Sequence, residues 1–121
     1  QMLGEHLDAD WLRLAPELEQ HVPPARVFDK AVYSPWISGA LDAQLRSGGI
    51  DTLIISGGET DVCVLATVLG AVDLGYRVIL VSDATCSSAD AGHDAALGIY
   101  GSRFGQQIEA VTTDQVLGCW F

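Results

Sequence analysis

The 121 residues include 16 acidic and 6 basic side chains, and the resulting net charge of −10 argues against nucleic acid or an anionic membrane as a partner. Hydrophobic residues make up 49% and charged residues 18%, which is typical of one globular domain, and no apolar run reaches the roughly 18 residues of a membrane span. The three cysteines fit neither a zinc-binding spacing nor a disulfide framework, so a reducing cytoplasm is the expected compartment.

The first fifty residues predict two helical segments separated by one short strand. In chain order we expect a helical segment over 7–22 that Pro16 divides, a strand over 26–29, a loop over 30–36 and a helix over 37–46. His6 and His21 have charged neighbours in the first segment, and we expect both at the surface. Leu41 and Leu45 are the expected inward-facing residues of the second helix, which ends at the Ser-Gly-Gly sequence at 47–49.

The remaining sequence alternates strands with helices. We expect a strand over 52–56 that is buried on both faces, an apolar helix over 61–74, a strand over 77–82, a loop over 83–88, a helix over 89–104, a strand over 108–111 and terminal helical turns over 113–119. This alternation implies βαβ units with right-handed crossovers. The chain is therefore predicted to be a single α/β domain over 1–121 with a parallel sheet.

The helix expected from Asp61 to Leu74 is apolar nearly all round. A helix at the surface of a monomer keeps a polar face, so the outer side of this one needs a cover. In a chain this short, a second subunit is the expected cover. We therefore predict a homo-oligomer formed through this helix.

Cys63 is the leading candidate for chemistry. It falls in the first turn of the apolar helix, just past the glycine turn at the carboxyl end of a strand, where open parallel sheets bind their ligands. The unpaired N–H groups of a helix start favour a thiolate, and Thr60 or Asp61 is the expected N-cap. The alternative is a small buried cysteine that packs under the sheet.

Two further features can serve Cys63. Lys30 is the only lysine, and an ammonium group beside the sulfur would stabilise a thiolate and orient a substrate oxygen. The backbone N–H groups of the turn over 57–60 can hold an oxyanion that forms when a thiolate attacks a carbonyl. The alternatives are a surface lysine that closes a strand and a tight strand-to-helix connection without a ligand.

Other polar residues have weaker cases. His93 is the natural general base by residue type, but its place within a helix is expected to direct it away from the crevice. Asp83 ends a strand at the same sheet edge as Cys63, where it can line the site or cap the turn through 84–85. We expect Cys86 and Cys119 to be structural.

The sequence GGETDVCVLATVLGAVDLGYRVILVSDATCSS, with DKAVYSPW upstream and GHDAAL downstream, resembles the isochorismatase-like cysteine hydrolases. That superfamily includes nicotinamidases, N-carbamoylsarcosine amidohydrolases and ureidoacrylate amidohydrolases. The resemblance covers residues 27–117. It implies a doubly wound, Rossmann-like parallel sheet with helices on both faces, in three αβα layers.

The resemblance also implies functional residues. It places the catalytic cysteine at Cys63, the catalytic lysine at Lys30 and a non-proline cis peptide at Gly58–Glu59, with the N–H groups of Glu59 and Cys63 binding the oxyanion. The family's third catalytic residue is an aspartate that ends the first strand, and nothing before Arg26 has that form. We therefore expect the chain to be the C-terminal portion of a longer domain.

The expected function is hydrolysis of a C–N bond in a small amide or ureide through a thioester. Tyr33, Trp36, Glu59 and Thr60 are the candidates for the substrate pocket. The family's metal ligands come mainly from the missing first strand, so we assign no metal and no cofactor. The alternatives are a vinyl-ether hydrolase of the isochorismatase type and a non-catalytic remnant that acts as an oligomer subunit.

Overall fold

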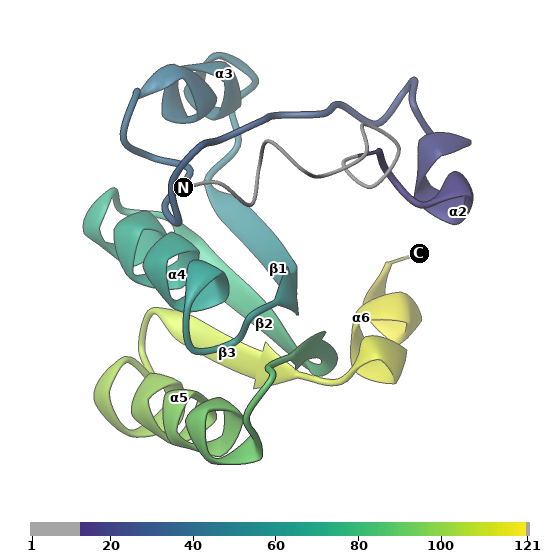
Figure 1. The fold of residues 1–121 in the computed structure, drawn as a ribbon. Coiled ribbons are helices and arrows are strands. Elements are labelled where there is room, and N and C mark those ends of the chain that lie inside the picture. The colour runs from purple at the N-terminus through teal and green to yellow at the C-terminus, as the bar shows by residue number, and fades with distance from the viewer. Residues whose placement is uncertain (1–12, 121) are drawn as a thin grey trace.

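The computed structural model describes residues 13–120, and its centre is a three-stranded parallel sheet. The strands β1 (Thr52–Gly58), β2 (Arg77–Cys86) and β3 (Ile108–Val111) lie side by side in that order (Figure 1). The predicted parallel sheet is thus confirmed, and β3 has the predicted bounds.

β2 is longer than the sequence indicated. The predicted loop over 83–88 is wrong at its start, because the strand continues to Cys86. After an irregularity in the pairing, Gly57 and Gly58 of β1 lie opposite Thr85 and Cys86 of β2. This second stretch of pairing brings the end of β2 alongside the turn that precedes Cys63.

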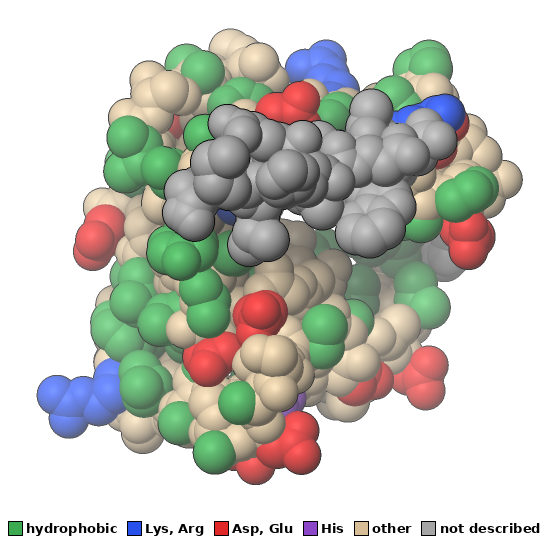
Figure 2. Space-filling model, in the orientation of Figure 1, with side chains coloured by type: hydrophobic (Ala, Val, Ile, Leu, Met, Phe, Trp, Pro, Cys, Tyr) green, Lys and Arg blue, Asp and Glu red, His purple; other side chains and the backbone are tan. Residues whose placement is uncertain are grey.

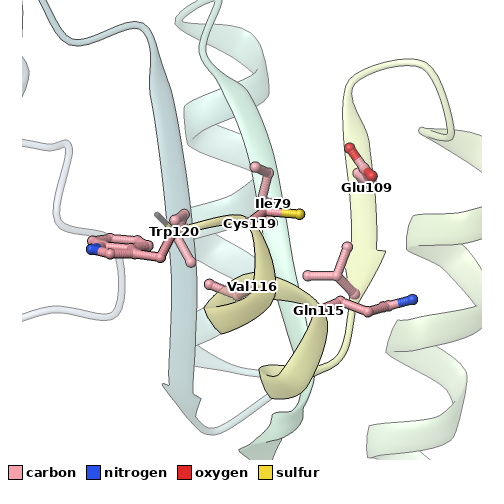
Figure 3. A pocket seen from close by; sticks show the side chains of 8 residues that line it. Ile79, Glu109, Gln115, Val116, Cys119 and Trp120 are labelled. Carbon is pink, nitrogen blue, oxygen red and sulfur yellow. The ribbon is translucent and has the colours of Figure 1, made fainter.

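Helices pack on the sheet from two sides. The described helices are α2 (Pro16–Glu19), α3 (Ala40–Ser47), α4 (Cys63–Asp73), α5 (Asp90–Arg103) and α6 (Thr113–Cys119). α4 and α5 cover one face, whereas α6 lies on the opposite face (Figures 1 and 3). α6 has its predicted bounds, because the Thr112 and Gln115 side chains form a capping box at its start.

The core lies between the sheet and the α4–α5 layer. Its largest fully buried side chains come from β2, from α4 and α5, and from the residue before β2: Tyr76, Tyr100, Leu80, Val68 and Val78. Burial of a large apolar side chain contributes roughly 1.5–3 kcal/mol, so this layer holds the domain together.

The opposite face of the sheet is more open. The prediction that β1 is buried on both faces is wrong, since Leu53 and Ile55 pack against the core but Ile54 is 44% exposed. Alternate residues of a strand point to opposite faces, and α6 covers only part of the face to which Ile54 belongs.

The region before β1 departs most from prediction. Residues 26–29 form no strand, and Val27 is 53% exposed. Of the helical segment predicted over 7–22, the structure describes the single short helix α2, and residues 1–12, with His6, lie outside the described part. His21 is exposed, as predicted. α3 begins three residues later than predicted because Gly39 before it has a left-handed φ of 77°.

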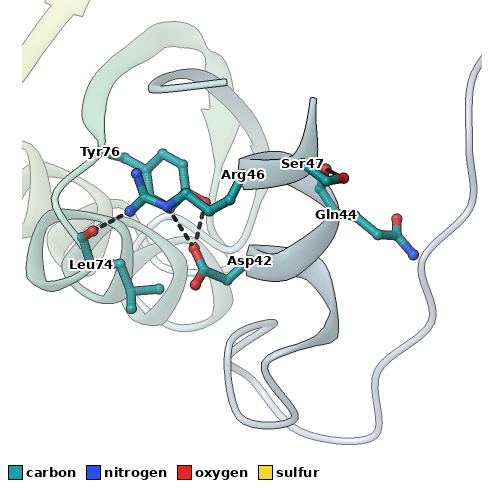
Figure 4. Close-up of polar contacts among 6 residues, drawn as sticks. All are labelled: Asp42, Gln44, Arg46, Ser47, Leu74 and Tyr76. Carbon is teal, nitrogen blue, oxygen red and sulfur yellow. Dashed lines mark hydrogen bonds and ion pairs between the residues drawn. The ribbon is translucent and has the colours of Figure 1, made fainter. Parts of the chain in front are cut away.

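A polar cluster joins α3 to the end of α4 (Figure 4). The Tyr76 hydroxyl donates to Asp42 over 2.5 Å, and the Arg46 guanidinium lies 4.1 Å from the centre of the Tyr76 ring. Arg46 also pairs with Asp42 and donates to the Leu74 carbonyl. Tyr76 is therefore held from both sides where the chain leaves α4 and enters β2.

The exterior of the molecule matches its composition. Figure 2 shows acidic side chains distributed over the drawn face and basic ones mostly near its margins, in keeping with the net charge of −10. None of the helices within residues 13–120 combines the length and the apolarity that crossing a bilayer requires. The Val64, Val68 and Ala71 side chains of α4 are buried within the single chain, and the oligomer through this helix stays a prediction.

Candidate active site

Cys63 is the first residue of α4, five positions beyond the end of β1, and so lies in the first turn of the helix as predicted. Its side chain is partly buried, and the thiol is free, as are those of the other two cysteines. Gly57 has a φ of 107°, which a residue with a side chain rarely adopts, and the Gly58–Glu59 peptide bond is cis, as the resemblance implied. A sharply turned loop over 57–62 thus connects β1 to Cys63.

The predicted N-cap is wrong. Val62 precedes the first helical residue, and no side chain caps the helix. The Thr60 and Asp61 side chains are bonded elsewhere, to α5 and to the loop that follows β2. The start of α4 therefore keeps its backbone N–H groups free of side-chain caps.

Two carboxylates fasten this loop to the serines after β2. Glu59 accepts hydrogen bonds from the Ser88 N–H over 3.0 Å and from the Ser88 hydroxyl over 2.7 Å. Asp61 accepts from the Ser87 hydroxyl over 2.6 Å. The bond from the Ser88 backbone, followed by that from its hydroxyl, holds the pKa of the Glu59 carboxyl below its ordinary value. These serines were missed in the sequence, although two hydroxyl residues directly after a strand at this sheet edge were a usable signal.

Thr60 is fully buried between the two carboxylates and is bonded at three atoms. Its N–H donates to the Cys86 carbonyl over 2.9 Å, its carbonyl accepts from the Tyr100 hydroxyl over 2.9 Å, and its Oγ1 lies 2.7 Å from His93 Nδ1. Burial raises the pKa of Tyr100 to about 12, so its hydroxyl stays a donor at neutral pH. The His93 ring thus reaches the loop before Cys63 through a buried hydroxyl, and its predicted orientation away from the crevice stays a prediction.

The backbone of the loop presents unpaired donors. The Glu59 carbonyl accepts from the N–H groups of Val62 and Val64, over 3.1 Å and 3.0 Å. Within residues 13–120, the N–H groups of Glu59 and Cys63 themselves have no acceptor. Both are thus available to an external anion, which is what an oxyanion site requires.

Lys30 lies apart from this network. It is exposed, its ammonium donates to the Val32 carbonyl over 3.0 Å, and it lines a pocket of about 280 Å³ together with Phe28, Ser34 and Ile37. In the described part of the chain, Lys30 makes no hydrogen bond to the Cys63 sulfur. The pairing of Lys30 with Cys63 therefore stays a prediction.

Trp36 attaches the Lys30 loop to the helix of the cysteine. Its indole N–H donates to the Thr67 carbonyl over 2.9 Å, and its ring stacks on Tyr76 with centroids 5.6 Å apart. The Thr67 hydroxyl in turn donates to the Cys63 carbonyl over 2.8 Å. Trp36 thus packs against α4, one turn beyond the cysteine.

Two further residues predicted to line the substrate pocket, Tyr33 and Thr60, differ in burial. Tyr33 is 65% exposed, whereas Thr60 is completely buried among its three hydrogen bonds. Their roles toward a substrate, and that of Trp36, stay predictions.

Asp83 and Cys119 lie outside the network, whereas Cys86 takes part in it through its backbone carbonyl. Asp83 accepts from the Thr113 N–H over 2.7 Å and from its hydroxyl over 2.8 Å, which lowers the pKa of Asp83 and fixes the start of α6. Neither predicted role of Asp83, in the site or in the turn over 84–85, is the contact observed. Cys86 and Cys119 are exposed, and the structural role expected for them stays a prediction.

A larger pocket, of about 480 Å³, lies between α6 and the open face of the sheet. Figure 3 shows Val116 and Trp120 on one side of it and Ile79 of β2 on the other. Neither Cys63 nor Lys30 lines it. Residues 13–120 contain no group of three or more His, Cys, Asp or Glu side chains arranged to hold a metal ion.

Comparison with known proteins identifies related sequences and structures. Residues 6–112 match the family model of the Isochorismatase domain. The chain is 32% identical over 111 residues to the uncharacterized isochorismatase family protein YwoC of Bacillus subtilis (strain 168), covering 92% of this chain and 57% of that protein. It is 32% identical over 93 residues to ureidoacrylate amidohydrolase RutB of Methylobacterium radiotolerans, covering 76% of this chain and 36% of RutB.

The fold has similar solved structures. The crystal structure of the nicotinamidase SaPncA from Staphylococcus aureus matches with a TM-score of 0.68 and 30% identity, covering 78% of this chain and 60% of that one. The chain therefore spans between about a third and three fifths of the length of these relatives.

Proposed function

The chain belongs to the isochorismatase family, and from this premise we propose that it forms the nucleophile-bearing part of a cysteine hydrolase. The substrate class we propose is a small amide or ureide whose C–N bond is cleaved. RutB, by its name, acts on ureidoacrylate, and SaPncA is a nicotinamidase. Both names describe hydrolysis of a C–N bond in a small molecule, which supports this substrate class.

One observation carries the proposal: a free cysteine begins α4 beside two backbone N–H groups without an acceptor. The Cys63 thiolate attacks the carbonyl carbon, and the carbonyl electron pair moves onto oxygen, where the N–H groups of Glu59 and Cys63 stabilise it. The C–N bond then breaks, the nitrogen leaves with a proton, and a thioester remains. Water hydrolyses the thioester to a carboxylic acid and restores the thiol.

The proton for the leaving nitrogen comes from a general acid that we assign to no residue of this chain. Lys30 is the proposed cation that keeps the sulfur ionised. This role requires its ammonium, now bonded to the Val32 carbonyl, to face the sulfur when substrate is bound.

The test is replacement of Cys63 in the intact protein. Ammonia release from nicotinamide, ureidoacrylate and other small amides is measured first, and the active substrate is then used with Cys63→Ala. We expect kcat/KM to fall at least roughly a thousandfold with an unchanged circular dichroism spectrum, because the nucleophile is lost. Cys86→Ala and Cys119→Ala are the matched controls and should retain activity. Full turnover by Cys63→Ala would exclude a cysteine mechanism.

A further inference from the structure

We infer that His93 is a positioning residue for the oxyanion site, acting through the Thr60 hydroxyl; this inference rests on the proposed function. His93 belongs to the first turn of α5, 30 positions beyond Cys63, and its Nδ1 lies 2.7 Å from Thr60 Oγ1. Thr60 directly follows one proposed oxyanion donor, Glu59, and precedes the other, Cys63, by three positions. A rotation of Thr60 therefore moves both donors.

The bond to His93 differs from the other two that hold Thr60. The N–H of Thr60 donates to the Cys86 carbonyl, and its carbonyl accepts from the Tyr100 hydroxyl. These two bonds hold the Thr60 backbone against the end of β2 and against α5. With only these two bonds, Thr60 can still rotate about the line that joins its N–H and carbonyl groups. The side-chain bond to His93 removes that rotation, because it holds a third atom of the same residue.

The neighbour of His93 supports the same reading. Gly92 lies so close to Asp61 that a Cβ added there would be 1.9 Å from Asp61 Oδ2. The first turn of α5 therefore contacts the loop at two successive residues, Asp61 through a glycine and Thr60 through the imidazole. Within residues 13–120, the hydroxyl of the fully buried Thr60 is the hydrogen-bond partner of the His93 ring.

The alignment of the oxyanion donors is sensitive to such a contact. Displacement of catalytic groups by about 1 Å can lower the rate by roughly a hundredfold even when substrate binding is retained. Loss of the His93 bond should therefore lower kcat and leave KM nearly unchanged. The bond itself requires only a hydrogen-bonding atom where Nδ1 lies, and an asparagine side chain supplies one.

The experiment compares His93→Leu, His93→Asn and Asp94→Asn in the intact protein. Asp94 is exposed and its side chain has no hydrogen-bond partner in the described part of the chain, so it is the matched control. We expect His93→Leu to lower kcat by about tenfold to a hundredfold with KM within about twofold, and His93→Asn to restore most of the loss. Asp94→Asn should behave as the wild type.

Two outcomes overturn the inference. One is a kcat for His93→Leu equal to that of the wild type, and the other is an equal loss in His93→Leu and His93→Asn. If His93→Leu fails to fold, Thr60→Val and Thr60→Ser replace it, because valine keeps the shape without the hydroxyl and serine keeps the hydroxyl. The inference then requires a loss in Thr60→Val and recovery in Thr60→Ser. A wild-type rate in Cys63→Ala would instead refute the proposed function, so the two failures are distinguishable.

Discussion

The two loops that carry the candidate catalytic residues are held in different ways. The loop over 59–63 is held by hydrogen bonds to β2, to the serines after it and to α5, and its residue Thr60 is fully buried. The loop over 30–36 is mostly exposed, and within residues 13–120 its hydrogen bond to α4 comes from the indole of Trp36. Many bonds from separate elements fix a position in three dimensions, whereas one contact leaves a hinge.

This difference separates the proposed catalytic groups into a rigidly held set around Cys63 and a more loosely held Lys30. Within residues 13–120, the proposed nucleophile and oxyanion donors are held by hydrogen bonds to β2, to the serines after it and to α5. The proposed role of Lys30 requires its loop to lie near Cys63, and Trp36 attaches that loop to α4. Substitutions at the Trp36 contact should therefore change the position of Lys30. Substitutions around Thr60 should change the positions of Cys63 and the oxyanion donors.

The largest expected effect on stability comes from a substitution that places an extra atom in the space that the Trp36 ring occupies. A Cβ at Gly70 would lie 2.3 Å from Trp36 Cδ1, and the ring cannot retreat while it is stacked on Tyr76. We expect Gly70→Ala to lower the free energy of unfolding by about 1–3 kcal/mol, the usual range for overpacking. Urea denaturation followed by tryptophan fluorescence measures this change.

Gly98→Ala is the matched control for this substitution. Gly98 also lies within a helix, but a Cβ there would have nothing within 4 Å. Alanine should therefore raise the free energy of unfolding by about 0.5–1 kcal/mol, because it restricts the unfolded chain. Equal behaviour of the two variants would show that Trp36 does not hold the loop against α4.

A smaller loss of stability is expected on removal of a tyrosine hydroxyl. Tyr100 contacts the loop over 59–63, and Tyr76 contacts Trp36 of the loop over 30–36. Tyr100→Phe leaves the Thr60 carbonyl without its donor and should cost about 1–2 kcal/mol of stability. Tyr76→Phe removes a bond to Asp42, which keeps its ion pair with Arg46, and should cost about 1 kcal/mol or less.

The two tyrosine variants should differ more clearly in activity. Only Tyr100→Phe loosens the loop of the oxyanion donors, so we expect it to lower kcat and Tyr76→Phe to leave kcat unchanged. Steady-state kinetics of both variants on the active amide gives the comparison. A greater loss of kcat in Tyr76→Phe than in Tyr100→Phe would contradict the role of Tyr100 in positioning the oxyanion donors.

The smallest expected effect is the loss of stability at low pH that the Glu59–Ser88 contact causes. The bonds from Ser88 hold the pKa of Glu59 below its ordinary value of 4.5, so the unfolded chain takes up this proton at a higher pH than the folded one. The stabilisation is present above pH 4.5 and is lost as the pH falls through the lowered folded pKa. Glu59→Gln should therefore show a weaker decline of Tm below pH 4.5 than the wild type. Parallel Tm curves for the two proteins would mean that the carboxylate contributes nothing to the loop.

Local signals in the sequence predicted the regular elements well. The capping pair at 112 and 115 and the apolar residues of β3 are sufficient to define α6 and β3. The extension of β2 was missed because it depends on pairing with Gly57 and Gly58 after an irregularity. Residues 26–29 have the composition of a strand but form none, since a strand also requires a paired neighbour.

The site was only partly predictable for the same reason. Cys63 and the cis peptide follow from a local motif, and both lie where the motif indicated. The orientation of His93 depends on how α5 is rotated over the loop, which no neighbouring residue specifies. Thr60 and Asp61 looked like helix caps because they are short polar residues before a helix, yet tertiary partners on α5 and after β2 engage both side chains.

The most direct test of the account is the rate at which iodoacetamide modifies each cysteine of the intact protein, followed by mass spectrometry of the peptides. Cys63 is less exposed than Cys86 and Cys119, so exposure alone predicts that it reacts last. The account predicts that Cys63 reacts first and that its modification parallels the loss of ammonia release. Modification of Cys86 and Cys119 with Cys63 untouched, in a protein that still hydrolyses its amide, would contradict it.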